Sequence, residues 1–354
     1  MAYTDIDNPE EYFNTKLYTG NGTAIGSGGL AVTGVGFQPD WVWLKNRTTG
    51  DRSHQVYDVI RGVTKGLKVN SSDAENTSSE RLTAFGSDGF TVGNNGDVNT
   101  SGNAHVSWNW KAGTAVSGNT TGSGTAKAYS GSVSTAAGFS IVQYLGNGTA
   151  AHTIPHHLGA IPRMIIVKKN ADAEWQVYHA SIGNGNVLHL DTASAVEDVT
   201  NRWNDTTPTS SVFAIGTSGN VNGNDARYIA YCFADVQGYS KFGSYIANAN
   251  ANGPFVYTGF KPAFFLTKNT TQATDWIMYD NRRDGFEPQN KEFRANAADA
   301  ERNAEDNNVQ FCANGFKLRN AGTKSNADSS NLFMFMAFAE QPLVTSTGVP
   351  ATAR

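Results

Sequence analysis

The residues best suited to hold a metal ion are the seven histidines of the chain. None stands in an HExxH motif or in the Cys/His spacing of a zinc site. His156 and His157 cannot both face one ion from a strand, because successive side chains point to opposite faces. The Asn/Asp/Gly segments 93–99 and 220–226 offer oxygen ligands but lack the spacing of an EF-hand loop. The sequence does not decide whether these loops bind calcium. The sequence predicts no metal centre and no cofactor.

Paired carboxylates are the next candidates, and they occur twice, as Asp73 with Glu75 and as Asp299 with Glu301. Two carboxyl groups facing a cleft could act as acid and base on a polysaccharide. Residues two apart in a loop more often cap a turn or a short helix. The chain also contains no GxSxG, SxxK or GxxxxGK[ST] motif. These features predict a protein without enzymatic activity and without catalytic residues.

Tryptophans are the candidates for carbohydrate binding, since sugar rings stack well on exposed indoles. Trp41 and Trp108 lie in regularly patterned strands and are expected in a core. Trp175 and Trp276 begin a strand beside a variable loop, and Trp203 lies in an insertion. We therefore expect Trp175, Trp203 and Trp276 to be exposed and to bind a glycan or a partner protein.

Two acid–base pairs recur at a spacing of three residues, Asp58 with Arg61 and Asp280 with Arg283. Each pair follows a short aromatic-bearing strand. We predict structural ion pairs that brace the following loop, each contributing about 1 kcal/mol or less if exposed. His179 stands where the other copies have the aspartate, so the pair is absent there.

These side chains belong to a pattern that occurs three times. Each copy has a glycine, a proline three residues later, a four-residue run that is mostly apolar, and a lysine six residues after the proline. Such a run is typical of a central strand that is buried on both faces. The three sets are Gly36, Pro39 and Lys45; Gly159, Pro162 and Lys168; and Gly259, Pro262 and Lys268.

Each copy continues with a second aromatic strand and closes on an apolar strand. Many short strands separated by turns, in copies of about 95–105 residues, are typical of β-sandwiches. We predict an all-β protein of three tandem jelly-roll or lectin-like sandwiches, with a short N-terminal helix that Asn8 caps and Pro9 begins. The predicted parts are an N-terminal attachment segment 1–15, repeats 16–113, 139–238 and 239–340, a flexible or extended Gly/Ser/Thr linker 114–138, and a C-terminal tail 341–354.

Composition limits the class of partner. The 354 residues carry a net charge of −4 with only 16% charged side chains, which disfavours nucleic acid and anionic membranes as partners. No apolar run approaches the ~18 residues of a membrane span, so membrane insertion is not expected. Cys232 and Cys312 are expected to be small buried side chains, although the sequence also allows a single disulfide between them.

The motifs LYTGNGT, GVGFQPDWVWLKNR, VYDVIRG, FGSDGFTVG and VSWNWKAG resemble a repeat of tail-fibre-like virion proteins of tailed bacteriophages, particularly marine and cyanobacterial phages. FADVQGYSKFGSY and FMAFAEQPLVTSTGVPATAR extend the resemblance over nearly the whole chain. The resemblance implies a virion component made of β-rich modules, which contacts host surface polysaccharide or the capsid and tail. It supplies no catalytic residues.

The expected function is therefore that of a non-enzymatic virion structural protein, either a tail fibre or a head or tail appendage, assembled in the host cytoplasm. A polysaccharide-degrading tail enzyme and a secreted carbohydrate-binding adhesin are the alternatives. Repeated particle sites favour symmetric assemblies. We therefore expect a homo-oligomer, first of all a trimer, with an end segment docked on another virion protein.

Overall fold

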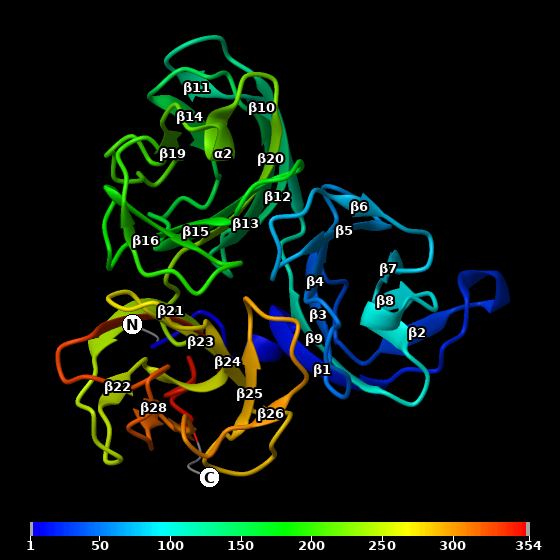
Figure 1. Cartoon of the computed structure of the whole chain (residues 1–354), viewed down its shortest axis with the longest axis vertical. Coiled ribbons are helices and arrows are strands. Elements are labelled where there is room, and N and C mark those ends of the chain that lie inside the picture. Colours follow the sequence, from blue (N-terminus) through cyan, green and yellow to red (C-terminus); the bar gives the residue numbers. More distant parts are fainter. Residues whose placement is uncertain (1–2, 352–354) are drawn as a thin grey trace.

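The computed structural model describes residues 3–351, and nearly all of its regular structure is antiparallel β-sheet. The prediction of an all-β protein is confirmed. Over the described range the strands form six sheets, and each large sheet is associated with a three-stranded sheet. We call each such pair of sheets a unit. The three units stand around a common centre in a triangle (Figure 1).

The first unit spans β1 to β9. Its large sheet has the order β1-β9-β3-β4-β5-β6, and its small sheet has the order β2-β8-β7. The strands are β1 (Phe13–Thr19), β2 (Leu30–Thr33), β3 (Trp41–Asn46), β4 (Gln55–Asp58), β5 (Lys65–Lys68), β6 (Asn76–Thr77), β7 (Leu82–Gly86), β8 (Gly89–Val92) and β9 (Ala104–Trp110). The helical turns are η1 (Pro9–Glu11), η2 (Ile25–Ser27) and α1 (Gly96–Asn99).

The third unit repeats this strand order, with β21-β29-β23-β24-β25-β26 beside β22-β28-β27. Its central strand β23 contains Pro262 at a shift in register, which is where a residue without an amide hydrogen is tolerated. The strands are β21 (Ser240–Ile246), β22 (Phe255–Tyr257), β23 (Phe260–Asn269), β24 (Ile277–Asp280), β25 (Lys291–Arg294), β26 (Arg302–Asn303), β27 (Val309–Cys312), β28 (Gly315–Leu318) and β29 (Leu332–Pro342).

The second unit diverges from the other two. Its large sheet, β10-β12-β13-β20-β15-β16-β17-β18, gains β10 and β12 at one edge, and its small sheet is β11-β14-β19. Its elements are β10 (Thr114–Asn119), β11 (Thr121–Gly122), β12 (Ala128–Ser134), β13 (Phe139–Leu145), β14 (His152–Pro155), β15 (Met164–Lys169), β16 (Gln176–His179), β17 (Asn186–His189), β18 (Glu197–Asp198), β19 (Val212–Ile215), α2 (Gly219–Asn222) and β20 (Arg227–Phe233).

The segment 114–138 is extended, which is one of the two alternatives predicted, but it is not a flexible linker. This segment forms β10, β11 and β12, and β12 pairs with β13 from Tyr129 to Ser134. Its small Gly, Ser and Thr side chains offer little to bury. The main-chain hydrogen bonds to an existing sheet edge therefore order the segment, and these bonds depend on the second unit rather than on local composition.

The core explains how the units are joined. In β3, Trp41 and Trp43 face a cluster shared by all three units, while Val42 and Leu44 face the small sheet of their own unit. This is the alternation expected of a strand buried on both faces. Across the shared cluster, Trp41 stacks on Tyr231 of the second unit with ring centroids 4.6 Å apart. The three large sheets therefore enclose one apolar core instead of forming three separate domains.

The two ends of the chain pack on the third unit. Asn8 caps the short helix η1, with Pro9 at its start, so that prediction is confirmed with a 3₁₀ rather than an α geometry. The Tyr3 hydroxyl donates to the Gly259 carbonyl (2.7 Å), and the Ser346 amide donates to Asp7 (2.6 Å). The predicted attachment segment and tail thus contact the chain itself; their outermost residues, 1–2 and 352–354, lie outside the described part.

Candidate functional site

The repeated lysines lie at the boundaries between units, which we call junctions. Lys45, Lys168 and Lys268 are buried, and burial lowers the pKa of each to about 8. Each ammonium group donates to a main-chain carbonyl of another unit, which stabilises its charge. The acceptors are, in the same order, Ala298 (3.0 Å), Ser72 (3.2 Å) and Ala193 (3.2 Å).

The three contacts run around the triangle in one direction: the first unit reaches the third, the second reaches the first, and the third reaches the second. The main chain follows the same cycle. Amide groups of the neighbouring units donate to the carbonyls two residues after the lysines, from Glu301 to Arg47, from Glu75 to Asn170 and from Val196 to Thr270. The repeated lysine is therefore a junction residue.

Trp175 and Trp276 are not exposed, so the prediction that they bind glycans is wrong. Both indoles are buried, and their Nε1 groups donate to the carbonyls of Lys68 (2.9 Å) and His189 (2.8 Å) in a neighbouring unit. The variable loop before each of them stays largely exposed, whereas the indole itself is covered. A sugar ring has no access to either face.

His54 occupies the same position in the first unit, one residue before the second aromatic strand. Its Nδ1 accepts a hydrogen bond from the Trp43 indole (2.9 Å), so the neutral ring carries its proton on Nε2. That side of the ring faces the main chain of Arg294 in the third unit, and burial lowers its pKa. The His54 ring meets Phe293 of the third unit edge-on at 5.6 Å. Its Nε2 is buried without a hydrogen-bond partner among the described residues, so this junction lacks the bond that the two indoles make.

Trp203 is also buried, contrary to prediction. Its Nε1 donates to the Asn186 carbonyl (3.1 Å), and its ring meets Tyr178 edge-on at 6.0 Å. The insertion that carries this residue therefore folds over its own unit. Trp203 fills space there and cannot serve as a platform for a ligand.

The predicted ion pairs are present and lie deeper than expected. Arg61 Nε is 2.6 Å from Asp58 Oδ2, and Arg283 Nε is 2.5 Å from Asp280 Oδ2, with all four side chains fully buried. The short-range spacing made the pairs predictable. The estimate for an exposed pair does not apply, because a buried charge depends on its partner.

Each buried aspartate also receives a hydrogen bond from another unit, which the sequence did not indicate. The Tyr231 hydroxyl donates to Asp58 (2.8 Å), and the Trp108 indole donates to Asp280 (3.0 Å). Tyr231 and Trp108 occupy equivalent places on β20 and β9. Aligning the closing strands of the three copies is the signal that could have identified these donors.

The third junction uses a neutral group. His179 Nδ1 accepts from the Ser181 amide (3.1 Å), so Nε2 carries the proton and donates to the Phe335 carbonyl of the third unit (3.3 Å). Burial lowers the pKa of His179 to about 4, which keeps the ring neutral. The ion pair is absent here, as the sequence predicts, and an interunit hydrogen bond replaces it.

The repeated carboxylates are engaged in ion pairs. Glu75 lies 3.2 Å from Arg61, and Glu301 lies 2.7 Å from Arg47 across a junction. Asp73 and Asp299 pair with Lys68 and Arg294 near the surface. Within residues 3–351 no cluster of three or more His, Cys, Asp or Glu side chains could hold a metal ion. Both cysteines are free thiols.

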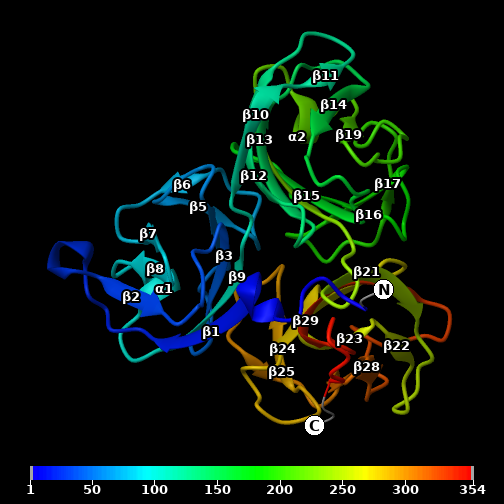
Figure 2. The ribbon, with the colours of Figure 1, turned by 180° about the vertical axis from the view of Figure 1, so that it is seen from behind.

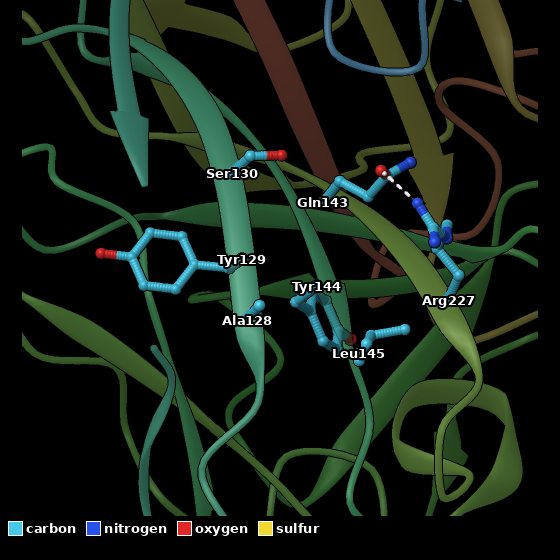
Figure 3. A pocket seen from close by; sticks show the side chains of 7 residues that line it. All are labelled: Ala128, Tyr129, Ser130, Gln143, Tyr144, Leu145 and Arg227. Atoms are coloured by element: carbon cyan, nitrogen blue, oxygen red, sulfur yellow. Dashed lines mark hydrogen bonds between the residues drawn. The ribbon is translucent and has the colours of Figure 1, made fainter. Parts of the chain in front are cut away.

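A shallow pocket of about 190 Å³ lies on the second unit, outside the junctions. Ser130, Gln143 and Arg227 come from three neighbouring strands, and Gln143 accepts from Arg227 (3.1 Å), as Figure 3 shows. The Tyr129 ring projects on the other side of β12 (Figure 3). One cation, an amide and a hydroxyl suit a polar or anionic ligand such as a sugar. Nothing in the sequence patterns singled these residues out.

Comparison with known proteins places most of the chain in one family. Residues 8–342 match the family model described as a domain of unknown function (DUF7483), and the chain belongs to that family. No curated protein and no solved structure matches the chain. Over the described residues, no helix is long and apolar enough to cross a membrane.

Proposed function

We propose that the chain is a non-enzymatic structural protein of a tailed bacteriophage particle, serving as a tail fibre or as a head or tail appendage. The sequence motifs that resemble virion proteins support this assignment. One of them, GVGFQPDWVWLKNR, supplies β3 and the junction lysine Lys45. The resemblance therefore covers the residues that hold the units together.

The observation that carries the proposal is the closed cycle of junctions. A particle component must keep its shape outside the cell, where shear and proteases act on any part that opens. Here each unit is tied to both others through buried lysines and a shared aromatic core. Opening one unit would expose the core of all three, so the body is suited to a rigid structural role.

Attachment to host surface polysaccharide would use polar surface rather than indoles. The pocket with Ser130, Gln143 and Arg227 offers donors and acceptors of the kind that sugar hydroxyl groups bind. A single shallow site binds weakly, and a particle gains avidity by presenting many copies. The proposal includes formation of a homo-oligomer, with a trimer as the preferred state. The contacts between chains must use surfaces outside the junctions, because the junctions are buried within each chain.

The direct test uses purified particles of a phage that encodes this chain. Mass spectrometry of density-banded infectious particles should detect the chain at a fixed copy number, and antibody against the recombinant chain should label one position on the particle. A chain absent from such particles would refute the proposal. Release of sugars from host capsule by the purified chain would instead support the polysaccharide-degrading alternative.

A further inference from the structure

Over the described range, the strands β10 and β12 occur only in the second unit. Without them, one edge of the large sheet is formed by β1 in the first unit, by β13 in the second and by β21 in the third. These strands are equivalent, because Phe13, Phe139 and Ser240 pair with matching residues of the closing strands. A sheet edge carries unpaired amide and carbonyl groups, and proteins cover or block such edges. The three edges of this chain differ in what covers them.

In the second unit the edge is fully paired. β12 adds antiparallel to β13, with Ser132 opposite Ile141 and Gly131 opposite Val142. A Cβ on Gly131 would lie 2.4 Å from the Ile141 carbonyl oxygen, so the close approach of the two strands requires glycine there. This pairing shows which kind of strand the edge accepts: one with small residues at its centre.

In the third unit the first half of the edge is blocked by the preceding turn. The Ser240 amide donates to the Val236 carbonyl (2.9 Å), and the Phe242 amide donates to Asp235 (2.8 Å). Of the residues of β21 whose main-chain groups point away from β29, only Ser244 and Ile246 are not covered by this turn. That length is too short for a stable added strand.

In the first unit the corresponding edge is open. The Lys111 amide donates to Tyr12 and the Gly20 amide to Asn103, so the even-numbered residues of β1 bond to β9. The main-chain groups of Thr15, Leu17 and Thr19 therefore point away from the sheet. Over residues 3–351 β1 pairs with β9 alone.

A hollow of about 390 Å³ runs along this edge at the border between the first and third units. Its lining comes from Asn14–Leu17 of β1, from Glu10 and Gly34, and from Arg282 of the third unit. Figure 2 shows β1 at this border. Thr15 is only 7% exposed and its Oγ1 is buried, so its side chain is turned inward and the edge presents main-chain groups to an occupant.

We infer that the β1 edge at Thr15–Thr19 is the docking site for an extended segment of another virion protein, which adds as an antiparallel strand. This inference rests on the proposed function. Glycine and serine opposite Lys16 and Thr15 would reproduce the β12–β13 pairing. A second copy of the chain cannot dock here through its own β1 edge, because that edge is recessed beside Arg282 and two recessed edges cannot meet.

The first test needs no phage. The probe is a labelled synthetic peptide with the sequence of residues 127–135, KAYSGSVST, and fluorescence anisotropy measures its binding to the full chain. Leu17→Pro removes one outward amide hydrogen without touching the β9 ladder, and should weaken binding at least tenfold. Ser244→Pro, at the equivalent position of the third unit, is the matched control and should leave binding unchanged. Equal binding by both variants would overturn the inference.

The second test identifies the occupant. A photoreactive amino acid in place of Thr19, which is exposed, is incorporated into the full chain and mixed with dissociated particle proteins. We expect a cross-link to a small-residue-rich segment of a different virion protein. A cross-link to a second copy, or none at all, overturns the inference. Mass spectrometry of intact particles reports separately whether the chain is a virion protein, so the two failures are distinguishable.

Discussion

The junctions around Asp58 and Asp280 and the junction around His179 meet one structural demand with different chemistry. At the first two, a buried carboxylate binds an arginine and accepts a hydrogen bond from Tyr231 or Trp108. At the third, a neutral imidazole donates to a main-chain carbonyl. In that place the neighbouring closing strand carries Met336, which has no hydrogen to donate.

The difference shows that the side chain at a junction must match its neighbour in another unit. A carboxylate opposite Met336 would lose its interunit donor, and Ile182 has replaced the arginine in the same copy. The ionic set and the neutral set are therefore each complete, whereas a mixture would leave a buried polar group unsatisfied.

Asp280→Ala should have the largest effect. It removes the nearest partner of the fully buried Arg283 and the acceptor of Trp108, leaving Arg283 with Glu301 at 3.3 Å. We expect the free energy of unfolding to fall by about 3–5 kcal/mol, measured by denaturant titration. Asp73→Ala, which breaks the exposed pair with Lys68, is the control and should cost about 1 kcal/mol or less. Equal losses would contradict the comparison.

Acid should weaken the neutral junction in particular. The pKa of His179 is about 4 in the folded chain and about 6.5 when unfolded, so the unfolded state binds more protons between these values. The free energy of unfolding should therefore fall as the pH drops from 6.5 to 4, by up to about 3 kcal/mol for this residue. His105 and His156, also with pKa values of about 4, add in the same direction.

Asp191 opposes this trend, since burial raises its pKa to about 6 and the folded state then binds the extra proton. Burial also raises the pKa values of Asp40 and Glu292. Burial lowers the pKa values of six histidines, which outweigh these three carboxyl groups, so the net effect is acid destabilisation. His179→Asn keeps an acceptor for the Ser181 amide and removes the titrating ring. Thermal melts between pH 4 and 6.5 should show a shallower pH dependence for this variant, and an unchanged slope would count against the junction assignment.

Two junctions share a hydrogen bond from a tryptophan indole to a carbonyl of the neighbouring unit. Trp175→Phe and Trp276→Phe each delete one donor to a buried carbonyl of another unit, and should each lower the free energy of unfolding by about 1–2 kcal/mol. Nearly equal losses are expected because this bond has the same geometry at both junctions. Trp203→Phe, whose bond stays within one unit, serves as the control for indole removal itself. A loss at only one of the two junctions would break the equivalence.

The smallest change in the free energy of unfolding should come from placing the neutral set of His179, Ile182 and Met336 at the equivalent positions of the Asp58 junction. Asp58→His alone leaves the buried Arg61 with only its more distant partner Glu75 (3.2 Å), whereas Asp58→His with Arg61→Ile and Tyr231→Met copies the His179 junction. We expect the triple variant to recover most of the loss, because the buried arginine is gone and Glu75 keeps its hydrogen bond from Asn170 (3.2 Å). The lost stack of Tyr231 on Trp41 sets the part that is not recovered. Denaturant unfolding of the single and triple variants measures the recovery. A triple variant no more stable than Asp58→His would mean that the two sets are not interchangeable.

The fold class and the strand pattern were predictable because they depend on local periodicity. The run WVWL at 41–44 indicates a strand buried on both faces whatever lies beyond those faces. The ion pair of Asp58 with Arg61 was predictable for the same reason, since three residues of chain fix its separation. Asn8 and Pro9 likewise mark a helix start through their own backbone geometry.

The candidate site was less predictable. Exposure of Trp175, Trp203 and Trp276 was inferred from neighbouring loops, but exposure depends on what packs against those loops. The linker composition of 114–138 describes its side chains, whereas the edge of β13 supplies the hydrogen bonds that order it. Both errors come from contacts that no local window of sequence contains.

The sequence by itself determined the three copies, their strands and their short-range ion pairs, since each depends on residues close together in the chain. Only the tertiary structure decided that the copies close into a triangle around one core. Lys45 and the carbonyl of Ala298 are 253 residues apart in sequence and 3.0 Å apart in space. That contact forms because a buried ammonium group needs an acceptor, and the nearest suitable one belongs to another unit.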